Sequence, residues 1–171
     1  MELVVQNRTP EDAAQIVERI CGVCPVSHAH ASSIAGDKAY GITISNNARI
    51  VRNLLEGAQF LHSHILWLYN LAALDYVNPL NALQANVDDA YAVALENGLA
   101  LHSDLNQLYE KLAAFADNGQ LSIFSGNWFD ADGGEAYVDN PEANLILTSH
   151  YLEALKMQAR SSEMAALLGG K

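Results

Sequence analysis

Two cysteines, Cys21 and Cys24, are the residues of this sequence whose type and spacing could do chemistry. They are the only cysteines in the chain of 171 residues. A disulfide-stabilised secreted domain usually has more cysteines, spread along the chain. Two thiols three positions apart therefore indicate redox or metal chemistry.

The cysteine pair by itself leaves three kinds of site open. A thioredoxin-like redox pair needs a βαβ context, and no such pattern is present in the sequence. A zinc site needs two further Cys or His ligands. Four histidines could supply them: His28, His30, His62 and His64. Another metal that prefers thiolate ligands is equally compatible with the spacing.

The elements that must position these residues are helices. Thr9 is a good N-cap and Pro10 suits the first helical position, so a helix is predicted from Pro10 to Ile20. Gly22 and Pro25 end it, and the cysteines flank this break. Further helices are predicted over about Ser27–Tyr40, Asn46–Tyr76, Leu80–Leu95, Asp104–Ala116 and Pro141–Leu168.

The predicted helix Asn46–Tyr76 has one wide apolar face, because its apolar residues recur at steps of three or four. They are Ile50, Val51, Leu54, Leu55, Ala58, Leu61, Ile65, Leu68 and Ala72. Gly119 is expected to end the helix before it as a left-handed residue. Leu121–Phe124 is the best strand candidate, and Gly126–Asp139, rich in glycine and aspartate, is predicted to be a loop. The fold class is mainly α, a helical bundle built around the two long helices.

Composition restricts the partners. The net charge is −11 and no cluster of Lys and Arg is present, which argues against nucleic acid. Half of the residues are hydrophobic and 17% are charged, which indicates surface that another polypeptide covers.

The most apolar run, Ile65–Leu74, is interrupted by Asn70, whereas a membrane span needs about 20 apolar residues. The N-terminus lacks the features of a signal peptide. The expected location is cytoplasmic, or membrane-associated through a partner subunit.

The surroundings of the cysteines resemble a known metal-binding motif. The pattern R-x-C-G-x-C-x-x-x-H, from Arg19 to His28 and continued to Ser32, is similar to the N-terminal metal-binding motif of nickel–iron hydrogenase large subunits. The resemblance covers nearly the whole chain, most clearly residues 2–79 and 119–171, and implies that residues 1–171 are part of a large-subunit domain. The other segments that look like this family, in the same order, are Asn47-Ala-x-x-x-Arg52-Asn53-Leu, Gly57-Ala-Gln-Phe-Leu-His62-Ser-His64, Ala73-Leu-Asp75-Tyr-Val and Thr148-Ser-His150-Tyr-Leu-Glu153-Ala-Leu.

The resemblance implies roles for the residues of the motif. In the family, four cysteines hold a nickel ion, and two of them bridge to an iron that carries carbon monoxide and cyanide. Cys21 matches a terminal nickel ligand and Cys24 matches a bridging one, with Gly22 leaving room for the backbone to turn. His28 follows Cys24 by four residues and could donate a hydrogen bond to the bridging sulfur. The alternative is a buried histidine bonded to a backbone carbonyl.

Glu2 is the other candidate ligand. It precedes Cys21 by nineteen residues, at about the distance of an R-G-x-E motif of the family, whose glutamate binds a magnesium or iron ion. The arginine and glycine of that motif would lie before Met1. An exposed terminal glutamate is the alternative interpretation.

Ser63 departs from the family pattern. Many members have an aspartate between the two histidines of the L-H-x-H segment, so carboxylate-assisted chemistry at this position is in doubt. The remaining histidines are expected at helix packing surfaces or subunit contacts. They are His30, His62, His64 and His150.

The implied activity is the reversible oxidation of hydrogen to protons and electrons. The D-P-C-x-x-C-x-x-H motif and the family's proton-transfer glutamate are absent from the sequence. The resemblance therefore implies two partners, a further large-subunit polypeptide with the second CxxC motif and a small subunit with iron–sulfur clusters. Both cysteines of this chain are already committed, so it holds no such cluster itself. The alternative is a non-catalytic module, either zinc-stabilised or derived from a hydrogenase.

Overall fold

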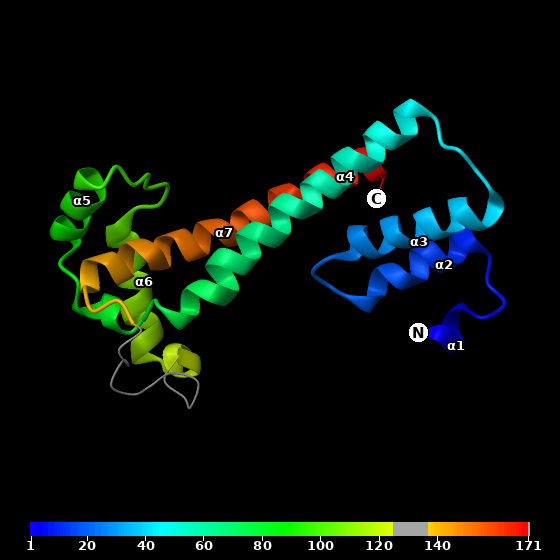
Figure 1. Cartoon of the computed structure of the whole chain (residues 1–171). Coiled ribbons are helices and arrows are strands. Elements are labelled where there is room, and N and C mark those ends of the chain that lie inside the picture. Colours follow the sequence, from blue (N-terminus) through cyan, green and yellow to red (C-terminus); the bar gives the residue numbers. More distant parts are fainter. Residues whose placement is uncertain (125–136, 171) are drawn as a thin grey trace. The chain divides into compact units, whose positions relative to one another are not determined.

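The computed structural model describes residues 1–124 and 137–170, and every regular element in these residues is a helix (Figure 1). The mainly α prediction is confirmed. The chain divides into two compact units. The cysteine unit comprises Met1–His64 and Met157–Lys171, and the core unit comprises Ile65–Lys156. The expectation that residues 1–171 belong to a single large-subunit domain stays a prediction.

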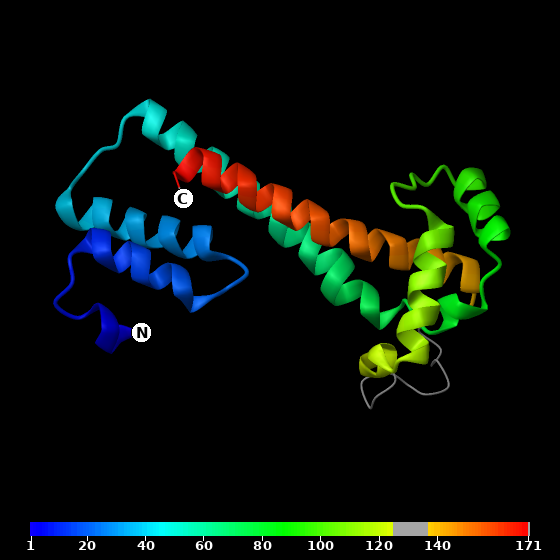
Figure 2. The same cartoon turned by 180° about the vertical axis from the view of Figure 1, so that it is seen from behind.

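The cysteine unit begins with a short helix, α1 (Glu2–Val5), which the sequence did not predict. The predicted helix Pro10–Ile20 is present as α2 (Pro10–Val17), followed by a 3₁₀ turn, η1 (Glu18–Ile20). The Thr9 hydroxyl accepts a hydrogen bond from the Asp12 N–H at 3.2 Å, which confirms the cap. Figures 1 and 2 both show α2 lying beside the next helix, α3.

The helix after the cysteines, α3 (Pro25–Tyr40), begins two residues earlier than Ser27. Pro25 occupies its first position, where the missing N–H costs nothing because that group has no partner inside a helix. Gly41 ends the helix in the left-handed conformation, with φ of 66°. Residues 21–24 are thus held between η1 and α3.

The predicted helix Asn46–Tyr76 changes its pitch twice. It consists of α4 (Asn46–Ile65), a π-helix, η2 (Leu66–Leu71), and a 3₁₀ turn, η3 (Ala72–Asp75). Periodicity could not detect these changes, because apolar steps of three or four residues are compatible with all three helix types.

Two predictions in the core unit were wrong. The predicted helix Leu80–Leu95 is divided into η4 (Asn81–Gln84) and α5 (Val87–Glu96), because the Asn86 side chain caps a new helix there. The predicted strand Leu121–Phe124 is a 3₁₀ helix, η5 (Gln120–Phe124). A short apolar run does not distinguish a strand from a buried helical turn.

The remaining helices match the sequence well. They are α6 (Leu105–Asp117) and α7 (Pro141–Gly169), and α7 continues into the cysteine unit. Gly119 follows α6 with φ of 78°, as predicted. Most of the predicted loop Gly126–Asp139 lies outside the described residues. Among the described residues, no helix is both long enough and apolar enough to cross a membrane.

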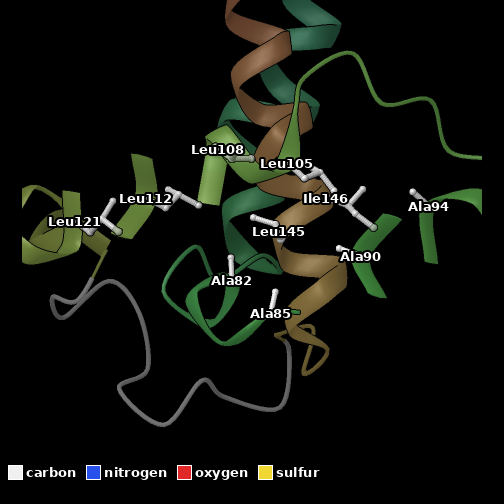
Figure 3. Packing of buried hydrophobic residues seen from close by; sticks show 10 residues of the cluster. All are labelled: Ala82, Ala85, Ala90, Ala94, Leu105, Leu108, Leu112, Leu121, Leu145 and Ile146. Atoms are coloured by element: carbon white, nitrogen blue, oxygen red, sulfur yellow. The ribbon is translucent and has the colours of Figure 1, made fainter. Parts of the chain in front are cut away.

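The hydrophobic core lies entirely in the core unit (Figure 3). Its side chains come from η4 and the residue that follows it, Ala85, and from α5, α6, η5 and the first part of α7. The cluster consists of Ala82, Ala85, Ala90, Ala94, Leu105, Leu108, Leu112, Leu121, Leu145 and Ile146. No residue of this cluster carries the chemistry indicated by the sequence.

Candidate metal centre

Three side chains of the motif lie close together in the cysteine unit. The sulfurs of Cys21 and Cys24 and a ring nitrogen of His28 all lie within 4.8 Å of one another, and each residue is half-buried. Three such donor atoms could hold a metal ion. The structure therefore brings together the three residues that the sequence predicted would share one site.

Local structure explains this convergence. Cys21 leaves η1 in an extended conformation, and Cys24 occupies the N-cap position of α3. His28 lies one turn into α3, where its backbone N–H donates to the Cys24 carbonyl at 3.4 Å. Residues four apart in a helix share one face, so His28 returns to the side on which Cys24 lies. Gly22 is not in the left-handed region, so the turn between the cysteines does not depend on glycine.

The two thiols have different electrostatic surroundings. The Val23 N–H donates to the Cys21 sulfur at 3.4 Å and is the largest cause of the lowered pKa of Cys21. The side chain and backbone N–H of Cys24 lower the pKa of Cys21 further. The pKa of Cys24 is raised, first by its hydrogen bond with Cys21 and then by burial. Cys21 is therefore the thiol that ionises first, and the thiolate is the form that binds metals.

A polar stripe on α4 faces this site. It consists of Arg52, Glu56, Gln59 and Ser63, at positions i, i+4, i+7 and i+11 of the helix. Glu56 accepts hydrogen bonds from Ser27 at 2.7 Å and from the His30 ring at 3.1 Å. Arg52 forms an ion pair with Asp37 on α3. These three contacts connect α3 to α4.

Gln59 contacts the cysteine loop, which comprises residues 21–24 between η1 and α3. Its side-chain amide donates to the Val23 carbonyl at 2.9 Å and to the Ser63 hydroxyl at 3.0 Å. Gln59 is buried, with 6% of its surface exposed. The sequence analysis did not single out Glu56 or Gln59. Polar residues recurring along one line of an otherwise apolar helix were the signal that could have found them.

A cavity of about 500 Å³ adjoins the cysteine loop within the cysteine unit. Gly22 and Val23 line it from the loop, and Gln59 and His62 line it from α4. The Nδ1 atom of His62 is buried and has no hydrogen-bond partner among the described residues. Burial lowers the pKa of His62, because it disfavours the charged form of the imidazole.

The other predicted residues lie outside the three-residue cluster. The His64 ring donates to the Phe60 carbonyl at 2.9 Å, and the His150 ring donates to the Ala100 carbonyl at 3.1 Å. The His64 contact lies within α4 itself, and the expected packing or subunit-contact roles of these histidines stay predictions. Glu2 is exposed on α1, and its role as a ligand of a separate ion stays a prediction.

Comparison with known proteins identifies the family. The structure is that of a helical protein with a candidate metal centre of two thiols and an imidazole. The family described as nickel-dependent hydrogenase matches residues 1–171. The chain is 38% identical over 175 residues to the uptake hydrogenase large subunit of Rhodobacter capsulatus. It is 40% identical over 176 residues to the hydrogenase-2 large chain of Escherichia coli K12. The chain belongs to the nickel-dependent hydrogenase family.

Solved structures of hydrogenases are also similar to this chain. The chain superposes on a [NiFeSe]-hydrogenase from Dm. baculatum with a TM-score of 0.66 and 32% sequence identity, covering all of this chain and 28% of that one. The Ni-Fe-Se hydrogenase from D. vulgaris Hildenborough gives a TM-score of 0.63 at the same identity and covers 26% of that chain. All of this chain aligns with 29% and 30% of the two large-subunit relatives. The chain therefore spans less than a third of the length of the proteins that it matches.

Proposed function

We propose that this chain is a component of a nickel–iron hydrogenase that catalyses the reversible oxidation of hydrogen to protons and electrons. The observation that carries the proposal is the cluster of Cys21, Cys24 and His28 within a chain that matches the family along its whole length. Cys21 would be a terminal nickel ligand, and Cys24 would bridge nickel and iron.

The donor atoms fit such a centre. Thiolate is a soft, charged ligand that suits nickel and iron. Hydrogen bonds from two backbone N–H groups favour the ionised form of Cys21, as ligation requires. When bound, the centre with its carbon monoxide and cyanide ligands would supply the redox-active metal at which hydrogen is split.

The other motif residues would support these two ligands. His28 would donate a hydrogen bond to the sulfur of Cys24 and so stabilise its negative charge. Glu2 would bind a separate magnesium or iron ion. Ser63 has no carboxylate, so it would not act as a base in the way that an aspartate could at this position.

The chain needs partners for this function. Two thiolates make half of a four-thiolate site, and the aligned relatives are more than three times as long as the matched region. A further large-subunit polypeptide would supply the second CxxC motif, and a small subunit with iron–sulfur clusters would carry the electrons. Exposed apolar side chains on α4, among them Leu54 and Leu61, would be covered in that assembly.

A zinc-stabilised module is the second candidate, because two thiols and an imidazole are also three of the four ligands of a common zinc site. Metal analysis separates the two. The polypeptides that co-purify with the chain are first identified and then co-expressed with it. The purified assembly is assayed for nickel, iron and zinc, and for hydrogen oxidation. Nickel and iron with activity support the hydrogenase, whereas zinc alone overturns it.

Two variants connect the metals to these residues. Cys21→Ser and Cys24→Ser should each abolish nickel-dependent hydrogen oxidation, because a serine hydroxyl is a harder and far less acidic ligand. The control is the circular dichroism of the assembly, which should keep its helical signal. Full activity in either variant contradicts the assigned ligand roles.

A further inference from the structure

The peptide groups on either side of Val23 connect the two cysteines to α4. The Val23 N–H donates to the Cys21 sulfur at 3.4 Å. The Val23 carbonyl, which belongs to the peptide that leads into Cys24, accepts from the Gln59 amide at 2.9 Å. The loop is therefore tied to a side chain 36 positions further along the sequence.

The Gln59 amide is committed to this contact. Gln59 is buried, and its NH₂ group has two acceptors, the Val23 carbonyl and the Ser63 hydroxyl. A buried amide that lost an acceptor would be left unsatisfied, and leaving a buried donor without a partner is unfavourable. The side chain is therefore held where its donor meets the loop.

Planarity of the peptide carries the contact across to the cysteines. In a trans peptide the C=O and the N–H point in opposite directions, so fixing one fixes the other. The N–H of this peptide belongs to Cys24, whose sulfur lies within 4.8 Å of both the Cys21 sulfur and a ring nitrogen of His28. We propose that Gln59 is a positioning residue, which fixes the Val23–Cys24 peptide and thereby the place of the Cys24 sulfur relative to Cys21 and His28.

This inference rests on the proposed function for its consequence. Hydrogen bonds to a ligating sulfur change the charge that the sulfur gives to its metal, and partners behind the ligands tune both affinity and potential. Gln59 does not touch the sulfur and would act through one rigid peptide. The same peptide also sets the direction in which the Cys24 side chain leaves the backbone.

Three substitutions isolate the donor. Gln59→Met keeps the length of the side chain but removes both N–H groups. Gln59→Glu keeps the shape and places carboxylate oxygens against two acceptors. Ser63→Ala removes the second acceptor and leaves the bond to Val23 in place. Gln15→Met, at an exposed position of α2, is the matched control for exchanging an amide for a thioether.

The first measurement does not require the metals. Hydrogen–deuterium exchange of the peptide that contains residues 21–24 is followed in the assembly purified from nickel-depleted cells. Loss of one hydrogen bond should make exchange in this loop about tenfold faster in Gln59→Met, and faster still in Gln59→Glu. Ser63→Ala and Gln15→Met should exchange at the wild-type rate. Wild-type exchange in Gln59→Met overturns the inference.

The second measurement reads the centre. In the nickel-loaded assembly, Gln59→Met should weaken nickel affinity by about 10–100-fold, and the infrared bands of carbon monoxide and cyanide should shift in the protein that retains metal. If exchange is faster in Gln59→Met but the wild-type assembly from nickel-supplied cells contains neither nickel nor iron, the proposed function is refuted and the positioning role stands. Unshifted bands with full occupancy would show that Gln59 only fills space.

Discussion

The two units of this protein are stabilised in opposite ways. The core unit contains every residue of the buried hydrophobic cluster. In the cysteine unit, the buried side chains among the described residues are Ala58, Gln59 and Ser161, two of them polar. There, polar side chains of α4 contact Asp37, Ser27, His30 and the backbone carbonyl of Val23.

The difference separates two tasks. Apolar burial is non-directional and suits a scaffold that needs only to be stable. Hydrogen bonds depend on distance and angle, so they suit a unit that must hold two sulfurs and an imidazole in place. The cysteine unit also keeps large apolar side chains exposed, which leaves surface available to a partner.

The largest expected effect lies in the core unit. Leu145 is fully buried, so Leu145→Ala should destabilise this unit by about 2–5 kcal/mol through lost burial and the cavity left behind. Hydrogen exchange in α5 and α6 should accelerate, while exchange in α3 stays unchanged. Leu95→Ala, at a side chain that is 83% exposed, is the control. Equal acceleration in α3 would mean that the two units unfold as one.

His28→Ala tests the opposite unit. Removing a side chain that supports metal ligands should lower activity or metal affinity of the assembly by about 10–100-fold. Hydrogen exchange in α5 and α6 should not change, because His28 lies in the cysteine unit and these helices lie in the core unit. Unchanged turnover at full metal loading would assign His28 a structural role alone.

The exposed apolar surface gives a smaller effect. Leu54 and Leu61 on α4 are 51% and 50% exposed, so each should contribute about 1 kcal/mol when a partner covers the rest. Leu54→Ser with Leu61→Ser should reduce binding of a hydrophobic dye by the isolated chain and weaken its capture by co-expressed partners. We expect the unmodified chain alone to be poorly soluble and to lack hydrogen uptake. A monodisperse, nickel-loaded, active monomer would contradict this.

The smallest effect concerns pH. The Arg52 guanidinium lowers the pKa of Asp37 below its ordinary value of 3.8. The contribution of this ion pair is therefore complete above pH 3.8 and is lost as the pH falls through the lower pKa of the folded state. Asp37→Asn should reduce the acid sensitivity of exchange in α3, with little change at pH 7. Hydrogen exchange in α3 of the double variant with Arg52→Gln should resemble that of each single variant. If the effects of the two substitutions simply add, the two side chains are not coupled.

Local signals in the sequence predicted most of the helices. Thr9 and Gly119 marked helix ends correctly, because capping depends on neighbouring residues alone. The strand at Leu121–Phe124 was wrong because a five-residue helical turn and a short strand present the same apolar run. The π-helix Leu66–Leu71 was missed because its apolar spacing matches that of an α-helix.

The sequence by itself determined the family and the residues that could bind a metal, since Cys21, Cys24 and His28 lie within eight consecutive positions. Only the tertiary structure decided what supports them. Glu56 and Gln59 lie more than 25 positions from the groups they contact on α3 and on the loop before it, and nothing local in the chain links those segments. Periodicity reports which face of a helix is apolar, whereas the partner of its polar face depends on how the helices pack.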